Sequence, residues 1–434
     1  MSELLELTVG PVAHGGFCVA RQPDGRVVFV RHALPGERVL AGVTEDRGGS
    51  YLRADAVQVL APSPDRVPPS CPVAGPGGCG GCDWQHAAPP AQRALKAAVV
   101  REALSRIAGL DVAVQVEALD GGQLGWRTRV QLAVGPDGRA GLHAHRSARV
   151  VPLDDCPLVV PATLPPVLSS TWPPGGTVEV IRDAEGAVHV TVAEPGPDGR
   201  GGSGGRGDHP GRLSRGGHPG RAGRSSRASR LSRVRGSGVA VQHAAGRRWQ
   251  VSAGGFWQVH PAAAGALAAA VDALAGAPSG GIAWDLYGGV GLFAAGLAAQ
   301  VGATGSVVLV ESSRRAVADA AANLADLPQV EVRAGRVERV LRSLPGIPDV
   351  VVADPPRRGL GRPLAHALAD RGPARFVHVA CDPAALARDV SAFADRGYRL
   401  AALRAFDAFP MTHHVECVAL LTRQPPGVSA LSDT

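Results

Sequence analysis

Short apolar runs alternate with alanine-rich segments between residues 250 and 421, and this alternation restricts the possible folds more than any other feature of the chain. Continuous apolar runs suit strands that are buried on both faces, as parallel strands are. Helical segments between the runs would supply the crossovers of a doubly wound sheet. We therefore expect residues 249–425 to form a Rossmann-like α/β domain, with strands at Ile282–Leu286, Ser306–Val310, Val350–Ala353 and Phe376–Ala380 and a final pair at Tyr398–Phe406 and Val415–Leu421.

Residues 1–62 have a different pattern. Short runs separated by Gly and Pro turns occur at Leu5–Val9, Arg26–Arg31 and Arg38–Val43. Several short strands in so few residues predict a small closed β-barrel of the oligonucleotide-binding type. Small barrels also exist without any role in nucleic-acid binding, so this pattern alone leaves the function of the domain open.

Residues 63–248 are expected to form a central, β-rich domain. A loop rich in Pro, Gly and Cys comes first, followed by a helix at Ala91–Ala108 and by short strands with a turn at Gly135–Gly138. Residues 196–236 lack hydrophobic periodicity and are rich in Gly, Arg and Ser. That composition predicts a disordered insertion.

The basic charge of the chain is concentrated in this insertion. Residues 199–236 contain ten arginines and one acid, Asp208, which is a local charge of +9, whereas the whole chain has a net charge of +7. The rest of the chain therefore carries −2, and the basic composition is weak evidence for RNA binding. The arginine–glycine tract either binds RNA or is a solvated loop.

Three acids at strand ends of the C-terminal domain predict a cofactor site. Asp285–Phe293 follows an apolar strand and contains three glycines, which allow a tight turn close to a ligand. Glu311 ends the next strand, where an acid can accept hydrogen bonds from ribose hydroxyls. Dinucleotide-binding folds use the same geometry, but the glycine spacing and the leading Asp285 favour S-adenosylmethionine. Asp354 begins an Asp-Pro-Pro segment after a later strand, at the edge where open sheets bind ligands.

Cys381 and Glu416 are the candidate reactive pair. Cys381 follows an apolar strand and precedes Pro383 and a helix, so we expect the helix N-terminus to lower the pKa of its thiol. By position alone, Cys381 could equally be an inert buried cysteine and Glu416 a surface acid. His413 and His414 are interpreted as structural polar residues that point apart on a strand, rather than as metal ligands.

Four further cysteines predict a metal centre. Cys71, Cys79 and Cys82 lie close together in the sequence, and Cys156 follows after 73 residues. Four thiolates hold either zinc or an iron–sulfur cluster. Zinc sites more often use two close pairs, so this three-plus-one spacing favours [4Fe–4S] in a structural or RNA-positioning role. Cys18 and Cys417 are expected to be packing residues.

Taken together, these motifs resemble the RNA uracil-5-methyltransferase family. The resemblance rests on Gly255–Pro261, Asp285–Phe293, Asp354–Gly359, Cys381–Asp389 and Thr412–Glu416, in this order, and the N-terminal barrel is similar to the TRAM domain. It implies that S-adenosylmethionine is bound by Gln258, Tyr287, Glu311 and Asp354, that Cys381 is the nucleophile and Glu416 the base, and that the four cysteines hold [4Fe–4S]. The sequence departs from the family pattern at Gly288, His260 and Asp382, where Cys, Asn and Asn are usual.

The expected function is methylation of carbon 5 of a uridine in structured RNA, in a ribosomal or transfer RNA loop, through a covalent bond between Cys381 and carbon 6. Arg357 stands where amine-directed enzymes have an aromatic residue, which argues against them. The alternatives are an S-adenosylmethionine enzyme that acts on another base and an inactive RNA-binding or RNA-chaperone protein. With no signal peptide and no apolar span of membrane length, we expect a cytoplasmic monomer without membrane contact.

Overall fold

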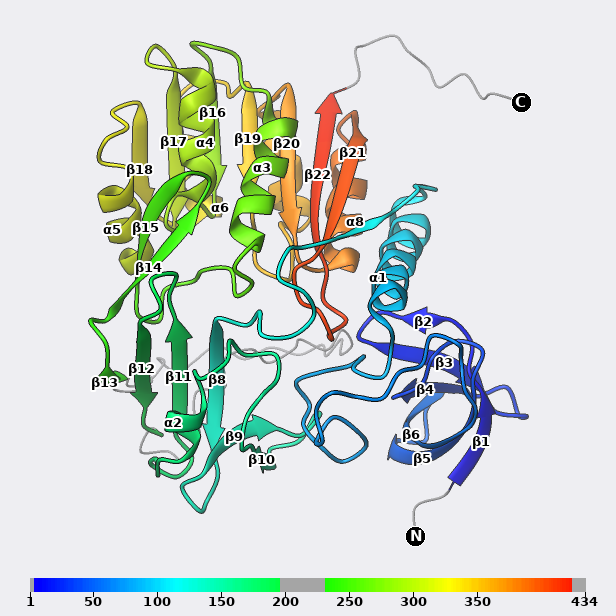
Figure 1. Ribbon diagram of the computed structural model, residues 1–434. Coiled ribbons are helices and arrows are strands. Elements are labelled where there is room, and N and C mark those ends of the chain that lie inside the picture. Colours follow the sequence, from blue (N-terminus) through cyan, green and yellow to red (C-terminus); the bar gives the residue numbers. More distant parts are fainter. Residues whose placement is uncertain (1–3, 196–230, 424–434) are drawn as a thin grey trace, which may run out of the picture.

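The computed structural model describes residues 4–195 and 231–423, which form three sheets, a separate hairpin and the surrounding helices (Figure 1). In Figure 1 the N-terminal sheet lies at the lower right, the central sheet at the lower left and the largest sheet above both. The domain limits at residues 62 and 248 stay predictions, and the structure adds contacts that cross them.

The N-terminal sheet has six strands in the order β1-β5-β6-β4-β3-β2, and β4 and β6 are parallel. Its inner face is apolar, and Val28, Val30 and Val39 are completely buried. The three strands predicted here are confirmed, each within a few residues, whereas β2, β3 and β6 were not predicted. The strands are β1 (Leu4–Thr8), β2 (Val12–Ala13), β3 (Phe17–Arg21), β4 (Val27–Arg31), β5 (Arg38–Asp46) and β6 (Tyr51–Ala61).

Helix α1 (Pro89–Ala103) connects the N-terminal half of the chain to the C-terminal sheet. Prolines occupy its first turn, where no backbone N–H is required, and the helix continues as a π-helical turn, Leu104–Ala108. The predicted helix is therefore confirmed. Lys96 of α1 is completely buried, and its Nζ lies 2.5 Å from Oδ1 of Asp407 in β21 (Tyr398–Asp407). This ion pair ties α1 to the largest sheet.

The central sheet has the order β10-β9-β8-β11-β12-β13 and is entirely antiparallel. Its last strand corrects the sequence analysis, because residues 231–235 of the predicted insertion form β13 and pair with β12. Residues 196–230 lie outside the described residues. The elements are β8 (Arg129–Val134), β9 (Ala140–His143), β10 (Val150–Pro152), α2 (Pro165–Leu168), β11 (Thr177–Arg182), β12 (Val188–Ala193) and β13 (Leu231–Arg235).

A hairpin of β14 (Val239–Ala244) and β15 (Arg247–Ser252) links the central sheet to the C-terminal domain. It packs against helix α5 (Arg314–Asn323). The Asp319 carboxylate of that helix accepts hydrogen bonds from the backbone N–H and the hydroxyl of Ser252, at 2.9 and 2.6 Å. The hairpin fixes the loop that follows it, which contains Gln258.

The C-terminal sheet has eight strands in the order β18-β17-β16-β19-β20-β22-β21-β7. The strands from β18 to β20 are parallel, as predicted, and β22 is antiparallel to both neighbours. The strand β7 lies within the predicted central domain, yet it pairs with β21. The strands not given above are β7 (Val116–Ala118), β16 (Ile282–Leu286), β17 (Ser306–Glu311), β18 (Val330–Ala334), β19 (Val350–Ala353), β20 (Arg375–Ala380) and β22 (Glu416–Arg423).

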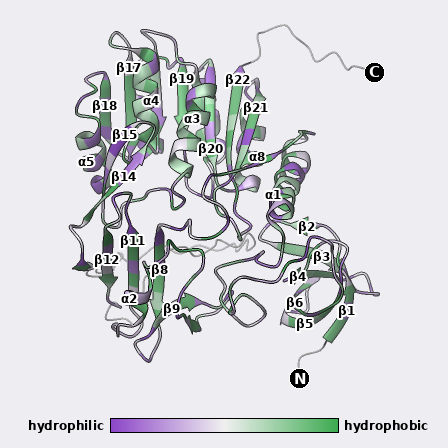
Figure 2. Ribbon diagram, in the orientation of Figure 1, coloured by the Kyte–Doolittle hydropathy of each residue, from purple (hydrophilic) through white to green (hydrophobic). Residues whose placement is uncertain are grey.

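Helices cover both faces of this sheet, and an apolar core fills each side. Figure 2 shows its strands as mostly hydrophobic, which agrees with strands buried on both faces. Completely buried side chains such as Trp284 and Phe376 each contribute about 1.5–3 kcal/mol. In the described part of the chain, no helix has the length and hydropathy needed to span a bilayer. The helices not given above are α3 (Ala263–Ala275), α4 (Leu292–Val301), α6 (Val337–Val340), the 3₁₀ turn Leu341–Ser343, α7 (Arg362–Asp370) and α8 (Pro383–Ala394).

Candidate active site

The strand order places the predicted site residues along one edge of the sheet. Asp285 lies near the end of β16, and Glu311 ends β17, the strand beside it. Asp354 follows β19, on the other side of β16. Ligands of open sheets bind at this edge, where the strand order reverses between β16 and β19. The three acids therefore lie along the edge at which folds of this kind bind ligands.

Pairing between the last strands brings the reactive pair to the same edge. In the antiparallel register of β20 and β22, Ala380 faces Cys417. The next residue on each side is Cys381, directly after β20, and Glu416, the first residue of β22. Two residues that are distant in the sequence thus lie at adjacent strand ends.

The loop after β16 requires its glycines. Gly289 and Gly291 have φ angles of +55° and +101°, which side chains disfavour. A Cβ at Gly291 would lie 2.5 Å from Cδ1 of Leu324, and one at Gly288 would lie 2.5 Å from Cγ of Leu309. The loop therefore packs closely on the neighbouring segments and leads directly into α4.

The acids of the cofactor site oppose one another electrostatically. Asp285 is completely buried, and burial together with Asp354 and Glu311 raises the pKa of its carboxyl from 3.8 to about 8, although the N–H of Ala294 donates to its Oδ2. Burial also raises the pKa of Asp354 to about 7. A cationic ligand among these carboxyls would relieve their repulsion. The positively charged sulfonium and amino groups of S-adenosylmethionine meet that requirement.

Glu311 and Tyr287 lie beside the same loop. Oε2 of Glu311 accepts the N–H of Gly289 at 3.2 Å and Oε1 accepts the N–H of Ser313 at 2.6 Å, so the carboxylate is oriented by the backbone. Tyr287 has a φ angle of +61°, and burial raises the pKa of its phenol to about 12. The ring is partly buried against the apolar core on one face of the sheet.

Gln258 lies apart from this row of residues. It is 8% exposed and lines a small cavity between the central sheet and the β14–β15 hairpin, together with Thr128, Arg129, Gln242 and Trp257. Its predicted contact with the methyl donor stays a prediction.

The predicted lowering of the Cys381 pKa is wrong. Burial and the neighbouring Glu416, together with Asp354 and Asp382, raise the pKa of this thiol to about 12, although Arg357 acts to lower it. The helix N-terminus that follows is occupied by Asp382, whose Oδ1 accepts the N–H of Ala385 at 2.8 Å. Position before a helix thus has less influence than desolvation and three acids.

Glu416 is also buried, at 5% exposure, and its pKa is raised well above the usual value by burial and by Asp354. Arg357 is the cation that opposes this effect, and its guanidinium lies 3.2 Å from Nε2 of His414. His413 and His414 have the structural contacts that we predicted, but their rings lie 4.1 Å apart and do not point away from each other. They belong to a turn before β22 rather than to a strand.

The segment before Glu416 is held by residues that the sequence analysis missed. The Asp83 carboxylate accepts from the N–H of His413 at 3.0 Å and lies 2.7 Å from its Nδ1. The Gln92 amide oxygen accepts the N–H of Met411 at 2.8 Å. Asp83 follows a predicted cysteine ligand and Gln92 lies on α1, so neither position carries a sequence signal for a partner more than 300 residues away.

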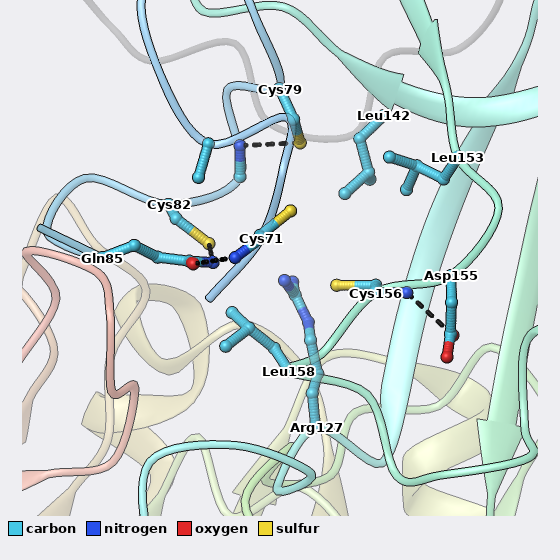
Figure 3. A pocket seen from close by; sticks show the side chains of 12 residues that line it. Cys71, Cys79, Cys82, Gln85, Arg127, Leu142, Leu153, Asp155, Cys156 and Leu158 are labelled. Atoms are coloured by element: carbon cyan, nitrogen blue, oxygen red, sulfur yellow. Dashed lines mark hydrogen bonds between the residues drawn. The ribbon is translucent and has the colours of Figure 1, made fainter. Parts of the chain in front are cut away.

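The four cysteines of the predicted metal centre line one cavity (Figure 3). The N–H of Gly81 donates to Sγ of Cys79 at 3.4 Å, and the Gln85 amide donates to Sγ of Cys82 at 3.3 Å. Arg127 extends toward the same space (Figure 3). Leu142, Leu153 and Leu158 complete the wall, together with Cys71 and Cys156.

Within residues 4–195 and 231–423, no group of three or more His, Cys, Asp or Glu side chains has the arrangement of a metal-ion site. The predicted [4Fe–4S] centre therefore stays a prediction. Cys18 and Cys417 are completely buried, which confirms them as packing residues.

Comparison with known proteins agrees with this architecture. The model of the TRAM domain matches residues 3–57, and that of tRNA (uracil-5-)-methyltransferase matches residues 346–424. Uncharacterized RNA methyltransferases of Streptomyces avermitilis and Streptomyces coelicolor are 45% and 46% identical, over 99% of this chain and 100% and 94% of theirs. The structure of Pyrococcus abyssi tRNA (uracil-54, C5)-methyltransferase with S-adenosyl-L-homocysteine has a TM-score of 0.69 at 22% identity, covering 96% of this chain and 100% of that chain.

The fold and the relatives thus define an RNA methyltransferase with an N-terminal TRAM domain. The chain belongs to the family of these RNA methyltransferases, and its residues 346–424 match the tRNA (uracil-5-)-methyltransferase model.

Proposed function

We propose that this enzyme methylates carbon 5 of a uridine in a loop of ribosomal or transfer RNA, with Cys381 as covalent nucleophile and Glu416 as base. The observation that carries the proposal is the β20–β22 register, which supports a position of these two residues side by side at the cofactor edge. Cytoplasmic action by a monomer is part of the same proposal.

The chemistry needs both residues. The Cys381 thiol loses its proton, its sulfur bonds to carbon 6 of the uracil, and the electrons of the C5–C6 bond make carbon 5 nucleophilic. S-adenosylmethionine supplies an electrophilic methyl group. Carbon 5 then carries a methyl group and a proton, and Glu416 removes that proton, so that the C6–S bond breaks and the thiolate leaves. Because the target base must reach a half-buried thiol, it has to leave its stack, which favours a loop.

The raised pKa of Cys381 determines the pH dependence. A thiol with a pKa of about 12 is mostly protonated at neutral pH, so adduct formation is expected to accelerate about tenfold per pH unit over the range in which the RNA and the fold are intact. Loss of the Arg357 cation in Arg357→Gln should slow the step further at each pH, because Arg357 is the cation that lowers this pKa.

Trapping separates the two roles. Cys381→Ala should bind RNA and methyl donor yet form neither adduct nor product. Glu416→Gln should methylate the base but leave the bond between Cys381 and carbon 6 intact. A denaturant-resistant protein–RNA band should therefore accumulate. If the band persists in the double variant, another nucleophile is responsible and the proposal fails. Nucleoside mass spectrometry of RNA from a deletion strain would identify the modified uridine, and methylation of another base would support the alternative enzyme class.

A [4Fe–4S] cluster held by Cys71, Cys79, Cys82 and Cys156 is the second part of the proposal. Its support is the shared cavity and the N–H donors to two sulfurs, since four thiolates are the usual ligands of such a cluster. A cluster spreads its ligands over four irons, so they stand farther apart than those of one zinc ion. The cluster would brace the segment that contains Asp83 and so support the turn before Glu416.

Protein purified anaerobically should contain about four irons per chain and absorb broadly in the visible range. Cys79→Ser should lose iron and stability together, because metal binding and folding are coupled. Cys18→Ala is the matched control and should retain its iron. Stoichiometric zinc without iron would contradict the proposal.

A further inference from the structure

The TRAM barrel touches the segment that contains the proposed nucleophile. His14 lies in the turn between β2 and β3, and its Nε2 is 3.2 Å from Oδ2 of Asp382, the residue after Cys381. Gly15 and Gly16 follow with φ angles of +94° and +81°, and a Cβ at Gly16 would lie 3.0 Å from Asp83. The turn is therefore seated closely on the catalytic domain and the cysteine-rich loop.

A second barrel residue supports the other side of the site. Arg31 of β4 is 4% exposed, and its Nη2 lies 3.7 Å from Oδ1 of Asp83. The other oxygen of Asp83 contacts His413, three residues before Glu416. The barrel thus reaches the segments next to both Cys381 and Glu416, through one contact each.

The negative charge of Asp382 disfavours ionisation of Cys381, and His14 lies where it can offset that charge. Its carboxylate lies next to Cys381, where Glu416 and Asp354 already disfavour a thiolate and Arg357 alone favours it. Oδ1 of Asp382 caps α8, while Oδ2 faces His14 from the barrel, with Arg388 of α8 nearby. Burial of Asp382 raises its pKa, but the hydrogen bonds from His14 and Ala385 outweigh this and the pKa is lowered. The carboxylate is therefore ionised and needs an opposing charge.

We propose that His14 is a positioning residue of the active site, which holds Asp382 and offsets its negative charge so that Cys381 can ionise. The inference rests on the proposed role of Cys381 as nucleophile. It gives the barrel a part in the chemical step, in addition to any contact with RNA.

The test measures the reactivity of Cys381 without RNA. The rate of its alkylation by iodoacetamide is followed by peptide mass spectrometry between pH 6.5 and 9.5. In His14→Ala the rate at pH 7 should fall about two- to fivefold, the factor that one charge at a helix terminus typically contributes. His14→Gln, which keeps an N–H donor without the charge, should lie between. Asp382→Asn retains the helix cap and should react faster than the native protein.

The double variant decides between electrostatics and structure. In the Asp382→Asn background, His14→Ala should have no further effect, because the charge to be offset is gone. The matched control is His366→Ala, which removes a histidine 3.1 Å from Asp395 at the opposite end of α8 and should leave the rate unchanged. Equal rates in native protein and His14→Ala, or an undiminished effect in the Asp382→Asn background, would overturn the proposal. Methylation by Cys381→Ala would instead refute the proposed mechanism, whatever the alkylation rates.

Discussion

The Lys96–Asp407 ion pair allows a quantitative test of how α1 is attached to the catalytic sheet. Lys96 is 0% and Asp407 1% exposed, and the Lys96 ammonium also donates to the carbonyl of Phe409 at 3.0 Å. Burial lowers the pKa of Lys96, and Asp407 opposes that effect. Removing one member of such a pair leaves an uncompensated charge in the interior, which typically costs about 3–5 kcal/mol.

Lys96→Met is therefore expected to destabilise the protein by about 3–5 kcal/mol, and Asp407→Leu by a similar amount. The double variant should be close to the native protein, because two apolar side chains replace two charges of similar volume. The coupling free energy in this double-mutant cycle is then about 6–10 kcal/mol, the sum of the two single losses and far above that of exposed pairs.

The assay is urea unfolding, monitored by tryptophan fluorescence, since Trp284 and Trp257 lie in the cores of the catalytic domain. Glu102→Gln is the control, because Glu102 pairs with Arg106 on the surface of the same helical segment and should change stability by less than about 0.5 kcal/mol. Additive losses in the two single variants would show that the ion pair is not an energetic unit and would refute the reasoning.

Three further predictions concern the cofactor loop and the insertion. Asp285 and Asp354 have pKa values raised from 3.8 to about 8 and about 7, so the stability that they contribute is complete near pH 4 and is lost as pH rises toward 8. The melting temperature of the native protein should therefore fall between pH 4 and pH 8, and that of Asp285→Asn should fall less. Gly291→Ala should abolish binding of S-adenosylmethionine in calorimetry, because its φ is +101° and a Cβ would meet Leu324, whereas Gly265→Ala, with open space around it, should bind normally. Deletion of residues 199–230, which spares β13, should leave the melting temperature unchanged and give a shallower salt dependence of RNA binding, since eight arginines are lost; a large drop in melting temperature would show that the segment is packed.

The catalytic strands were predictable because their signal is local. β16 and β19 coincide with the predicted ranges, since continuous apolar runs bounded by polar residues leave few choices of register. β18 was missed because its residues are only partly buried, and β7 because three residues carry little pattern. A short or half-exposed strand is defined by its neighbours, which a local pattern does not reveal.

The place of the candidate site at the strand ends was predictable, but its electrostatics were not. Cys381 and Glu416 follow from motif resemblance and lie at paired strand ends. The pKa of Cys381 could not be read from its place before a helix, because it depends on burial, on the adjacent Asp382 and on acids from two other segments, Glu416 and Asp354. The contact from His14 spans 368 residues of sequence, and nothing in the His-Gly-Gly turn indicates its partner.

The burial of Lys96 also determines whether the folded protein can be acylated on a side-chain amine. Lys96 is the only lysine in the sequence, and every other one of the 45 basic residues is an arginine. Reagents and enzymes that acylate side-chain amines therefore find no target on the folded protein, although its surface is rich in positive charge. Acylation at Lys96 would require α1 to separate from β21. The fraction of molecules that become acylated would therefore measure how often the contact between α1 and β21 opens.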